Sequence, residues 1–287
     1  MADLVIRNAT IVDGTGSPSR RGDVAVTGEH ITEVADRIES EARRDVDADG
    51  LVLTPGFVDI HTHYDGQVTW DPVVAPSSLH GVTSAVMGNC GVSFAPAKPT
   101  DADHDWLIGL LEGVEDIPGT ALAEGLPWDW ETFPDYLDAL DRRRWTIDIG
   151  AQVSHAPLRA YVMGTRGADP HEAPSADELT QMHRLVREGI EAGALGFTTS
   201  RTLLHRAIDG EPVPGTFATA DELLGIGRVL GELGRGVIEL ASDLMPEDPE
   251  LAWMERLSIE MAVRKGTHQP EHVDDFRRIV RRCVSEA

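Results

Sequence analysis

From about residue 56 onward, the sequence repeats one order of segments: a short apolar run, a loop, and a stretch with the pattern of an amphipathic helix. This order is typical of a parallel sheet whose strands are joined by crossover helices. The candidate strands are "GFVDIHTH", "GVTSAVMG", "TIDIGAQVSH", "ALGFTTS" and "GVIELAS". The repeat therefore predicts an α/β fold for this part of the chain.

Two of the predicted helices have clear starting signals. Ser175 with Glu178, and Thr219 with Glu222, each form a capping-box pattern in front of a single apolar stripe. A helix with one apolar stripe is suited to packing on a sheet, so both helices are expected to cover the predicted strands.

The first part of the chain has a different pattern. Residues 3–54 alternate short β-like runs with turn signals, as in "DLVIRNATIV", "DGTGS" and "GDVAVTG". We therefore expect a small β segment over residues 1–55 and a strand–helix domain over residues 56–248. Residues 249–287 are expected to form a divergent, helical tail.

The chain of 287 residues is strongly acidic, with 49 acidic and 25 basic residues and a formal net charge of -24. This charge repels phosphate backbones and anionic lipid headgroups, so no nucleic-acid or membrane partner is expected. The start lacks a basic leader, and no apolar window reaches the length of a membrane span, which predicts a cytoplasmic location. Cys90 and Cys283 are expected to be free thiols or metal ligands, because disulfides are rare in a reducing compartment.

The strongest candidate for a functional site begins with His61 and His63. On a strand, residues two apart point to the same face, so both imidazoles can converge on one ion while Thr62 points away. Cys90 ends the next predicted strand, and a cysteine thiolate between flexible glycines is a good zinc ligand. Buried or surface histidines and an inert cysteine are the alternatives, but the combination predicts a metal site.

Two long connections follow predicted strands and are rich in Gly and Pro, at residues 114–130 and 201–218. In α/β barrels this is the side of the active-site loops, so both are candidate walls of a substrate pocket. Arg159 and Arg201 are candidates for binding a substrate carboxylate, with a surface or loop-bracing role as the alternative for each. Further histidines are interpreted as plain polar residues, namely His80, His104, His183 and His205.

The motif "PGFVDIHTHYDG" resembles the first-strand motif of the amidohydrolase superfamily. More narrowly, "GVTSAVMGNCGVSFAP", "EDIPGTALAEGLPWDW", "HAPLRAYVMG" and "GALGFTTSRTLLH" together resemble the N-acyl-D-amino-acid deacylase (D-aminoacylase) branch. The resemblance runs from about residue 3 to about residue 256. It implies a partial TIM-like (β/α) barrel of the amidohydrolase type, preceded by a small β-sandwich segment.

The resemblance also implies zinc-dependent hydrolysis of the amide bond of a small-molecule N-acyl-D-amino acid, with one or two Zn²⁺ ions as cofactor. His61 and His63 match the paired ligands of one metal position, and Cys90 matches the thiolate ligand of the other, able to bridge. Relatives such as hydantoinases and dihydroorotases usually bridge their metals with a carboxylated lysine. The strand "ALGFTTS" has no lysine, which leaves Cys90 as the candidate bridge.

Several features depart from the family pattern. The fifth candidate strand, "GVIELASDL", has no histidine where the family supplies one, and Glu239 is its ionisable group. The aspartate that acts as the family's catalytic acid and base has no match, and Asp65 is not assigned to that role. Asp59 shares a face with the histidine pair and is expected either to orient a ligand or to be structural. His268 and His272 are interpreted as an exposed pair.

After the β segment only some 230 residues remain, whereas a closed barrel needs about 250. The chain is therefore expected to be a C-terminally truncated deacylase, and its incomplete barrel is expected to favour self-association. Two alternatives stay open: a non-catalytic remnant of such an enzyme, and an amidohydrolase acting on a cyclic amide.

Overall fold

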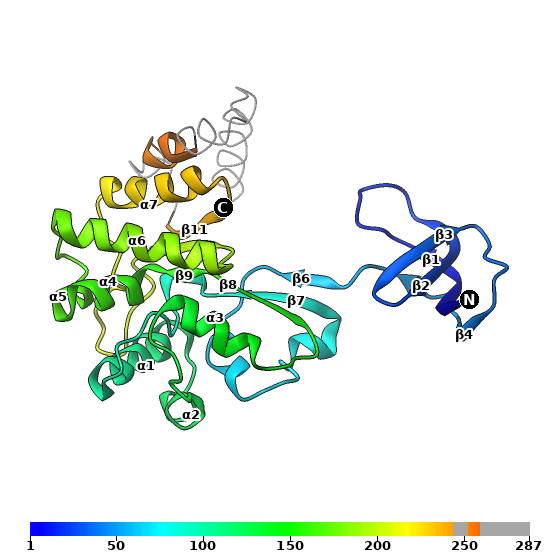
Figure 1. Cartoon of the computed structure of the whole chain (residues 1–287), viewed down its shortest axis with the longest axis horizontal. Helices are drawn as coiled ribbons and strands as arrows, with labels where there is room; N and C mark the ends of the chain where they lie inside the picture. The colour runs from blue at the N-terminus through cyan, green and yellow to red at the C-terminus, as the bar shows by residue number, and fades with distance from the viewer. Residues whose placement is uncertain (244–251, 259–287) are drawn as a thin grey trace. The chain divides into compact units, whose positions relative to one another are not determined.

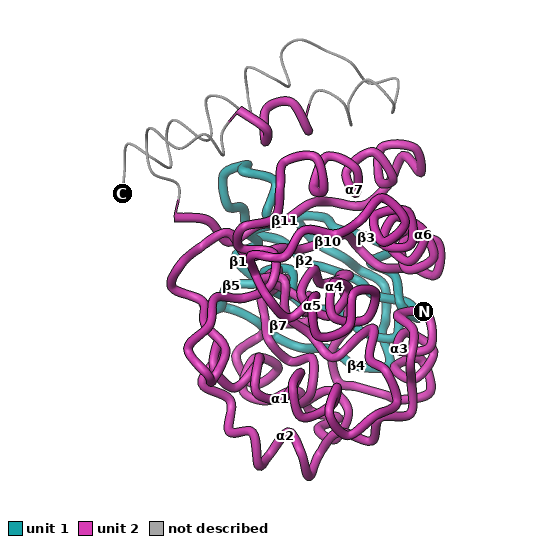
Figure 2. The backbone as a smooth tube through the Cα atoms, turned by 90° about the vertical axis from the view of Figure 1, so that its left-hand side faces the viewer, with its two compact units in different colours: residues 1–57 teal, residues 58–287 magenta. Residues whose placement is uncertain are grey.

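The computed structural model of the protein describes residues 1–243 and 252–258. It divides into two compact units, Met1–Phe57 and Val58–Ala287, which Figure 2 shows in different colours. Each unit has its own buried apolar side chains, so each is described by itself.

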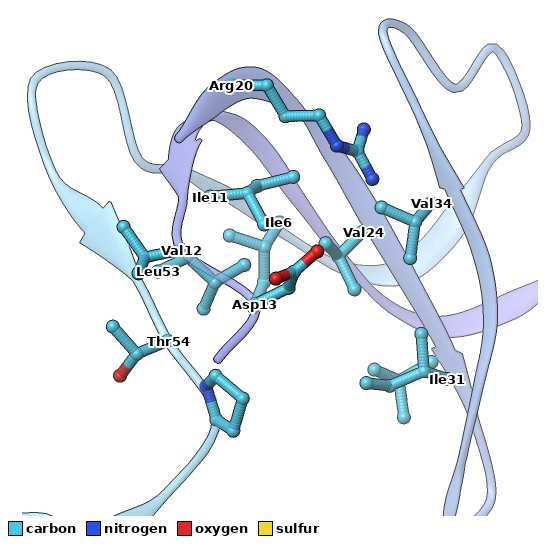
Figure 3. A pocket seen from close by; sticks show the side chains of 12 residues that line it. Ile6, Ile11, Val12, Asp13, Arg20, Val24, Ile31, Val34, Leu53 and Thr54 are labelled. Atoms are coloured by element: carbon cyan, nitrogen blue, oxygen red, sulfur yellow. The ribbon is translucent and has the colours of Figure 1, made fainter. Parts of the chain in front are cut away.

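The first unit is a sheet with the strand order β3-β2-β1-β4, and β5 also pairs with β1. Its strands are β1 (Ala2–Ile11), β2 (Arg20–Thr27), β3 (His30–Ala35), β4 (Ala42–Asp47) and β5 (Val52–Leu53). Strands β1, β2 and β3 pair antiparallel, whereas β4 and β5 run parallel to β1. One face of this sheet bears an apolar hollow of about 290 Å³, lined by side chains that include Ile11, Val24 and Leu53 (Figure 3).

In the second unit, the described residues form short sheets with the strand orders β6-β7-β8 and β9-β10-β11. The strands are β6 (Phe57–Asp59), β7 (Val82–Met87), β8 (Asp148–Ala151), β9 (Val153–Ser154), β10 (Gly196–Arg201) and β11 (Val237–Ser242). The pairs β7–β8, β9–β10 and β10–β11 are parallel. Both sheet orders follow the order of the strands along the chain, and only Gln152 separates β8 from β9. The strands of a (β/α) barrel follow one another in the same way. The predicted α/β fold is confirmed.

Helices follow the strands and cover them, as Figure 1 shows. They are α1 (Asp101–Glu115), α2 (Gly119–Gly125), α3 (Phe133–Asp141), α4 (His155–Met163), α5 (Thr165–Ala168), α6 (Ala176–Ala192) and α7 (Ala220–Leu233). The described residues also contain the short 3₁₀ turns η1 (Gln67–Thr69), η2 (Ser77–His80) and η3 (Asn89–Gly91). Helix α6 packs against α3, α4 and α7 through its apolar stripe.

The two predicted helix starts differ in one respect. Ser175 and Glu178 form the complete capping box at the start of α6. At the start of α7, the Thr219 side chain accepts from the backbone N–H of Glu222, but the Glu222 carboxylate instead contacts His155 and Arg159. The second capping box is therefore only half formed, because a buried ion pair holds its carboxylate.

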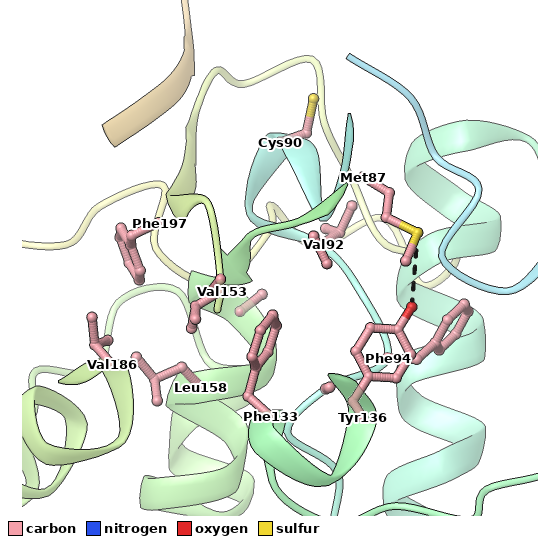
Figure 4. Close-up of a cluster of buried hydrophobic side chains, with 14 of the residues drawn as sticks. Met87, Cys90, Val92, Phe94, Phe133, Tyr136, Val153, Leu158, Val186 and Phe197 are labelled. Atoms are coloured by element: carbon pink, nitrogen blue, oxygen red, sulfur yellow. Dashed lines mark hydrogen bonds between the residues drawn. The ribbon is translucent and has the colours of Figure 1, made fainter. Parts of the chain in front are cut away.

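The core of the second unit lies between the strands and these helices. Figure 4 shows part of it, including Phe94, Phe133, Tyr136 and Phe197, with the Cys90 sulfur pointing away from them. The Tyr136 hydroxyl donates to the backbone oxygen of Asp65 over 3.0 Å, which ties the segment after β6 to helix α3. The core thus anchors the loops on which the candidate site is built.

Residues 252–258 form a further helical segment. The rest of the predicted helical tail, with His268, His272 and Cys283, lies outside the described residues. Within the described part of the chain, no helix combines the length and apolar character needed to cross a membrane.

Candidate metal centre

His61 and His63 lie just after β6, which ends at Asp59 rather than continuing through both histidines. The segment still runs alongside β7, since the backbone N–H and the side-chain hydroxyl of Thr62 both bond to the Val86 oxygen, at 3.0 and 2.8 Å. Thr62 therefore points away, and the two imidazole rings converge with their centroids 5.5 Å apart. The His61 side chain is 50% exposed and that of His63 is 13% exposed.

Cys90 occupies the tight turn η3 directly after β7. Its own φ is 55°, in the left-handed region, and Gly88 and Gly91 also have positive φ values of 81° and 73°. A Cβ atom at Gly91 would lie 2.8 Å from the backbone nitrogen of Ser200. Glycine at this position lets the turn lie directly on β10, and it places the Cys90 Sγ 3.2 Å from the His61 Nε2.

Substituting Gly91 tests this close approach. We expect Gly91→Ala to lower the free energy of unfolding by about 1–2 kcal/mol for the positive φ, and by about a further 1–3 kcal/mol for the overpacking against Ser200. Gly210→Ala is the matched control, because Gly210 has a φ of 88° and a Cβ atom there would meet nothing within 4 Å. Urea unfolding followed by circular dichroism measures both losses. Equal losses for the two variants would contradict the account of this turn.

Ligand atoms of His61, His63 and Cys90 all lie within 4.8 Å of one another. Two imidazoles and a thiolate are a donor set that Zn²⁺ prefers. The His63 Nδ1 is buried and has no hydrogen-bond partner within residues 1–243 and 252–258, which is costly unless a ligand or ion satisfies it. The three residues singled out from the sequence are thus brought together in a geometry that fits a metal ion.

The electrostatics of the cluster favour a cation. Burial first, and then the nearby carboxylates of Glu115, Glu239 and Asp65, raise the pKa of the Cys90 thiol to about 12. Burial also lowers the pKa of His63 to about 3, with smaller contributions from His61 and His205, so that its imidazole is neutral and free to bind a metal. A bound divalent cation would stabilise the thiolate against these carboxylates.

Two further residues lie at this cluster although the sequence did not single them out. Glu115, the last residue of α1, places its Oε1 3.1 Å from the His63 Nε2. His205, from the loop after β10, forms a second group with Cys90 and Glu115 whose ligand atoms are within 4.8 Å of one another. His205, which the sequence alone indicates only as a plain polar residue, lies in the 201–218 connection predicted to line the site. Burial raises the pKa of Glu115 to about 7.

Glu239, on β11, also reaches the histidine pair. Its Oε1 lies 3.1 Å from the His61 Nδ1, and its Oε2 accepts a hydrogen bond of 2.7 Å from the Gln152 Nε2. Asp59 accepts a 3.4 Å hydrogen bond from the backbone N–H of His61. The carboxylate beside the His61 ring therefore comes from the fifth strand predicted for the unit, β11, and not from β6.

A model of the amidohydrolase family matches residues 44–282 of the sequence, which is most of the chain. The chain belongs to the amidohydrolase family. The family match extends beyond residue 256, where the resemblance in motifs ends. It therefore includes most of residues 249–287, which are predicted from the sequence to form a divergent tail.

Two amidohydrolase relatives come from Alcaligenes xylosoxydans xylosoxydans. The chain is 37% identical to an N-acyl-D-glutamate deacylase over 236 residues, which cover 81% of this chain and 42% of that enzyme. It is 33% identical to a D-aminoacylase over 232 residues, which cover 81% of this chain and 43% of that enzyme. The chain thus spans about four-tenths of the length of these curated relatives.

Solved amidohydrolase structures agree with the fold. The chain matches a structure of D-aminoacylase, described with a binuclear metal centre, with a TM-score of 0.69 and 30% identity, covering 93% of this chain and 50% of that one. It also matches the N-acyl-D-glutamate deacylase of Bordetella bronchiseptica in complex with zinc and a phosphonate inhibitor, with a TM-score of 0.69 and 30% identity. That match covers 92% of this chain and 50% of the other. The predicted membership in the deacylase branch is confirmed.

The two candidate arginines make internal contacts in this amidohydrolase chain. Arg159, on α4, is fully buried and donates to the Glu222 Oε1 over 2.6 Å. Arg201, at the end of β10, donates to the backbone oxygens of Gly215 and Ala218 at 2.9 and 2.7 Å, across the 201–218 connection. These contacts are of the loop-bracing kind, and a substrate-binding role for either arginine stays a prediction.

Proposed function

We propose that this chain forms the metal-binding part of a zinc-dependent amidohydrolase that cleaves the amide bond of N-acyl-D-amino acids. The observation that carries the proposal is the convergence of His61, His63 and Cys90 in a chain 37% identical to an N-acyl-D-glutamate deacylase. A second relative acts on N-acyl-D-aspartate and is 35% identical over 229 residues. We therefore propose an acyl-D-amino acid with an acidic side chain as the first substrate to test.

In this proposal His61, His63 and Cys90 hold one zinc ion, and Cys90 with Glu115 and His205 provides a second candidate position. When bound, zinc supplies a Lewis acid and a metal-activated water for hydrolysis. The chain's own residues hold the ligands in place. Glu115 contacts the His63 Nε2, and the turn at Gly91 fixes Cys90 beside His61. Asp65 lies fully buried nearby, and burial, with a smaller effect of Glu115, raises its pKa to about 8.

We expect the purified chain to bind zinc and to release glutamate from N-acetyl-D-glutamate faster than from its L-enantiomer. Zinc is measured by elemental analysis after gel filtration, and glutamate by a coupled assay. His63→Asn is expected to lower both zinc content and turnover, whereas His30→Asn, in the first unit, leaves both unchanged. Absence of bound zinc together with absence of turnover on either enantiomer would refute the proposal for this polypeptide.

We also propose that the chain self-associates and is located in the cytoplasm. Exposed large apolar residues of the second unit include Val58 on β6, Ile60 just after it, and Val237 at the start of β11. Exposed apolar residues on outer strands favour association between chains. Light scattering coupled to gel filtration would show a mass above one chain; a single monomer mass at every concentration tested would contradict the association.

A further inference from the structure

Glu239 has both carboxylate oxygens engaged, although its strand, β11, stands at the end of the sheet order β9-β10-β11. One oxygen contacts the His61 Nδ1 at 3.1 Å, and the other accepts from the Gln152 Nε2 at 2.7 Å. The strand pairing with β10 places Glu239 opposite Thr198. The pairing of β11 with β10 thus fixes the backbone position of Glu239, and two polar contacts fix the position of its carboxylate.

The contact with His61 favours one position of the ring proton. A carboxylate oxygen offers only lone pairs, so a lone pair on the Nδ1 that lies 3.1 Å away would be repelled, and this favours a proton on Nδ1. The neutral ring then has its lone pair on Nε2, which is the nitrogen 3.2 Å from the Cys90 Sγ. Histidine ligands of metals are commonly held in this way, with one nitrogen on the metal side and the other bonded to a carboxylate.

A buried hydrogen-bond network connects Glu239 back to the histidine segment. The Gln152 Nε2 that bonds Glu239 also donates to the Asn89 Oδ1 at 2.9 Å. The Asn89 Nδ2 in turn donates to the backbone oxygen of Thr62 at 2.9 Å. Thr62 lies between the two histidines and Asn89 precedes Cys90, so one network touches both ligand-bearing segments.

The orientation of the Gln152 amide in this network is also defined. Gln152 and Asn89 are both buried, at 2% and 0% exposure, where exchange with water is limited. The Gln152 amide turns its NH₂ group toward the acceptors of Asn89 and Glu239, and its own Oε1 has no hydrogen-bond partner in the part of the chain that the structure describes. This orientation costs free energy, which the bond to the carboxylate offsets.

We propose that Glu239 is a positioning residue for the candidate metal centre. It selects the Nδ1–H tautomer of His61 and holds the ring with Nε2 directed at the Cys90 side, while Gln152 and Asn89 fix the carboxylate. The tautomer follows from contacts within this chain, and only the consequence for zinc affinity rests on the proposed function.

The tautomer is tested directly on the metal-free protein at pH 8 by long-range ¹H–¹⁵N correlation spectra of the imidazoles, with the His61 signals assigned by their loss in His61→Asn. We expect Nδ1–H to dominate in the wild-type chain and both tautomers to be populated in Glu239→Gln. Glu239→Asp, which keeps a carboxylate, should restore part of the preference. An unchanged tautomer population in Glu239→Gln and in Gln152→Ala would overturn the proposal.

Zinc affinity, measured by competition with a chromophoric chelator, gives the second readout. Glu239→Gln is expected to weaken zinc binding by about 10- to 100-fold, and the matched control Glu188→Gln, on the exposed face of α6, to leave it unchanged. Weaker zinc binding with an unchanged tautomer would contradict positioning and assign Glu239 a direct contact with the ion. A wild-type chain that binds no zinc would refute the proposed function, while the tautomer result would still decide the role of Glu239.

Discussion

Replacing Cys90 with alanine is expected to weaken zinc binding more than the loss of a residue that is only hydrogen-bonded to a metal ligand. Loss of such a residue costs about 10- to 100-fold in affinity. The thiolate is the only sulfur donor in the proposed ligand set, and it belongs to both groups of candidate ligands. Cys90 already has a β-carbon at a φ of 55°, so alanine adds no new backbone strain. The effect should therefore be specific to the sulfur. Competition with a chromophoric chelator measures the affinity.

The chain offers a matched control in its second cysteine, because Cys283→Ala removes the other thiol in the sequence. We expect that variant to bind zinc as the wild-type chain does. Cys90→Ser should weaken binding less than Cys90→Ala, since a hydroxyl keeps a weak oxygen donor at the same place. Unchanged zinc affinity in Cys90→Ala would remove Cys90 from the ligand set.

Replacing Glu222 with alanine is expected to lower the free energy of unfolding by about 3–5 kcal/mol, the usual cost of breaking a buried ion pair by removing one partner. The Glu222 Oε1 accepts from the Arg159 guanidinium at 2.6 Å and lies 2.9 Å from the His155 Nε2. All three side chains are buried, so the variant leaves an uncompensated cation inside the second unit. The control Glu188→Ala breaks the exposed pair with Arg184 and should cost about 1 kcal/mol or less. Urea unfolding of both variants decides between these values.

The same ion pair predicts how stability depends on pH. Burial alone would raise the pKa of Glu222, but the hydrogen bond and charge of His155, together with Arg159, lower it to about 2 from an ordinary value of 4.5. The unfolded chain therefore binds this proton first as pH falls, and the contribution of Glu222 to stability is lost between about pH 4.5 and pH 2. Glu222→Ala should flatten the stability curve in this window. An equally steep acid transition in the variant would show that other groups cause it.

Much of the fold could be predicted from local patterns. Short apolar runs and capping signals lie close together in the sequence, so the positions of β7, β10 and α6 could be inferred without knowing the tertiary structure. These local patterns predicted the structure wrongly where a tertiary contact competes with a local one. Strand β6 ends at Asp59, because the following segment turns to bring both imidazoles together, and the carboxylate of Glu222 goes to Arg159 instead of closing its capping box.

The site was predictable only in part for a related reason. His61, His63 and Cys90 carry recognisable local motifs at strand ends, and the structure brings these three side chains together. Glu115, His205 and Glu239 come from a helix end, a loop and a late strand, and no spacing rule relates them to His61. Arg159 was predicted only as a candidate for binding a substrate carboxylate, because sequence alone does not reveal that Glu222 lies against it.

X-ray absorption at the zinc edge of the loaded chain tests the central claim most directly. If His61, His63 and Cys90 hold the ion, the spectrum will show one sulfur neighbour at about 2.3 Å and nitrogen neighbours at about 2.0–2.1 Å. The sulfur signal should disappear in Cys90→Ala and persist in Cys283→Ala. A wild-type spectrum with only oxygen and nitrogen neighbours would contradict the assignment of this site.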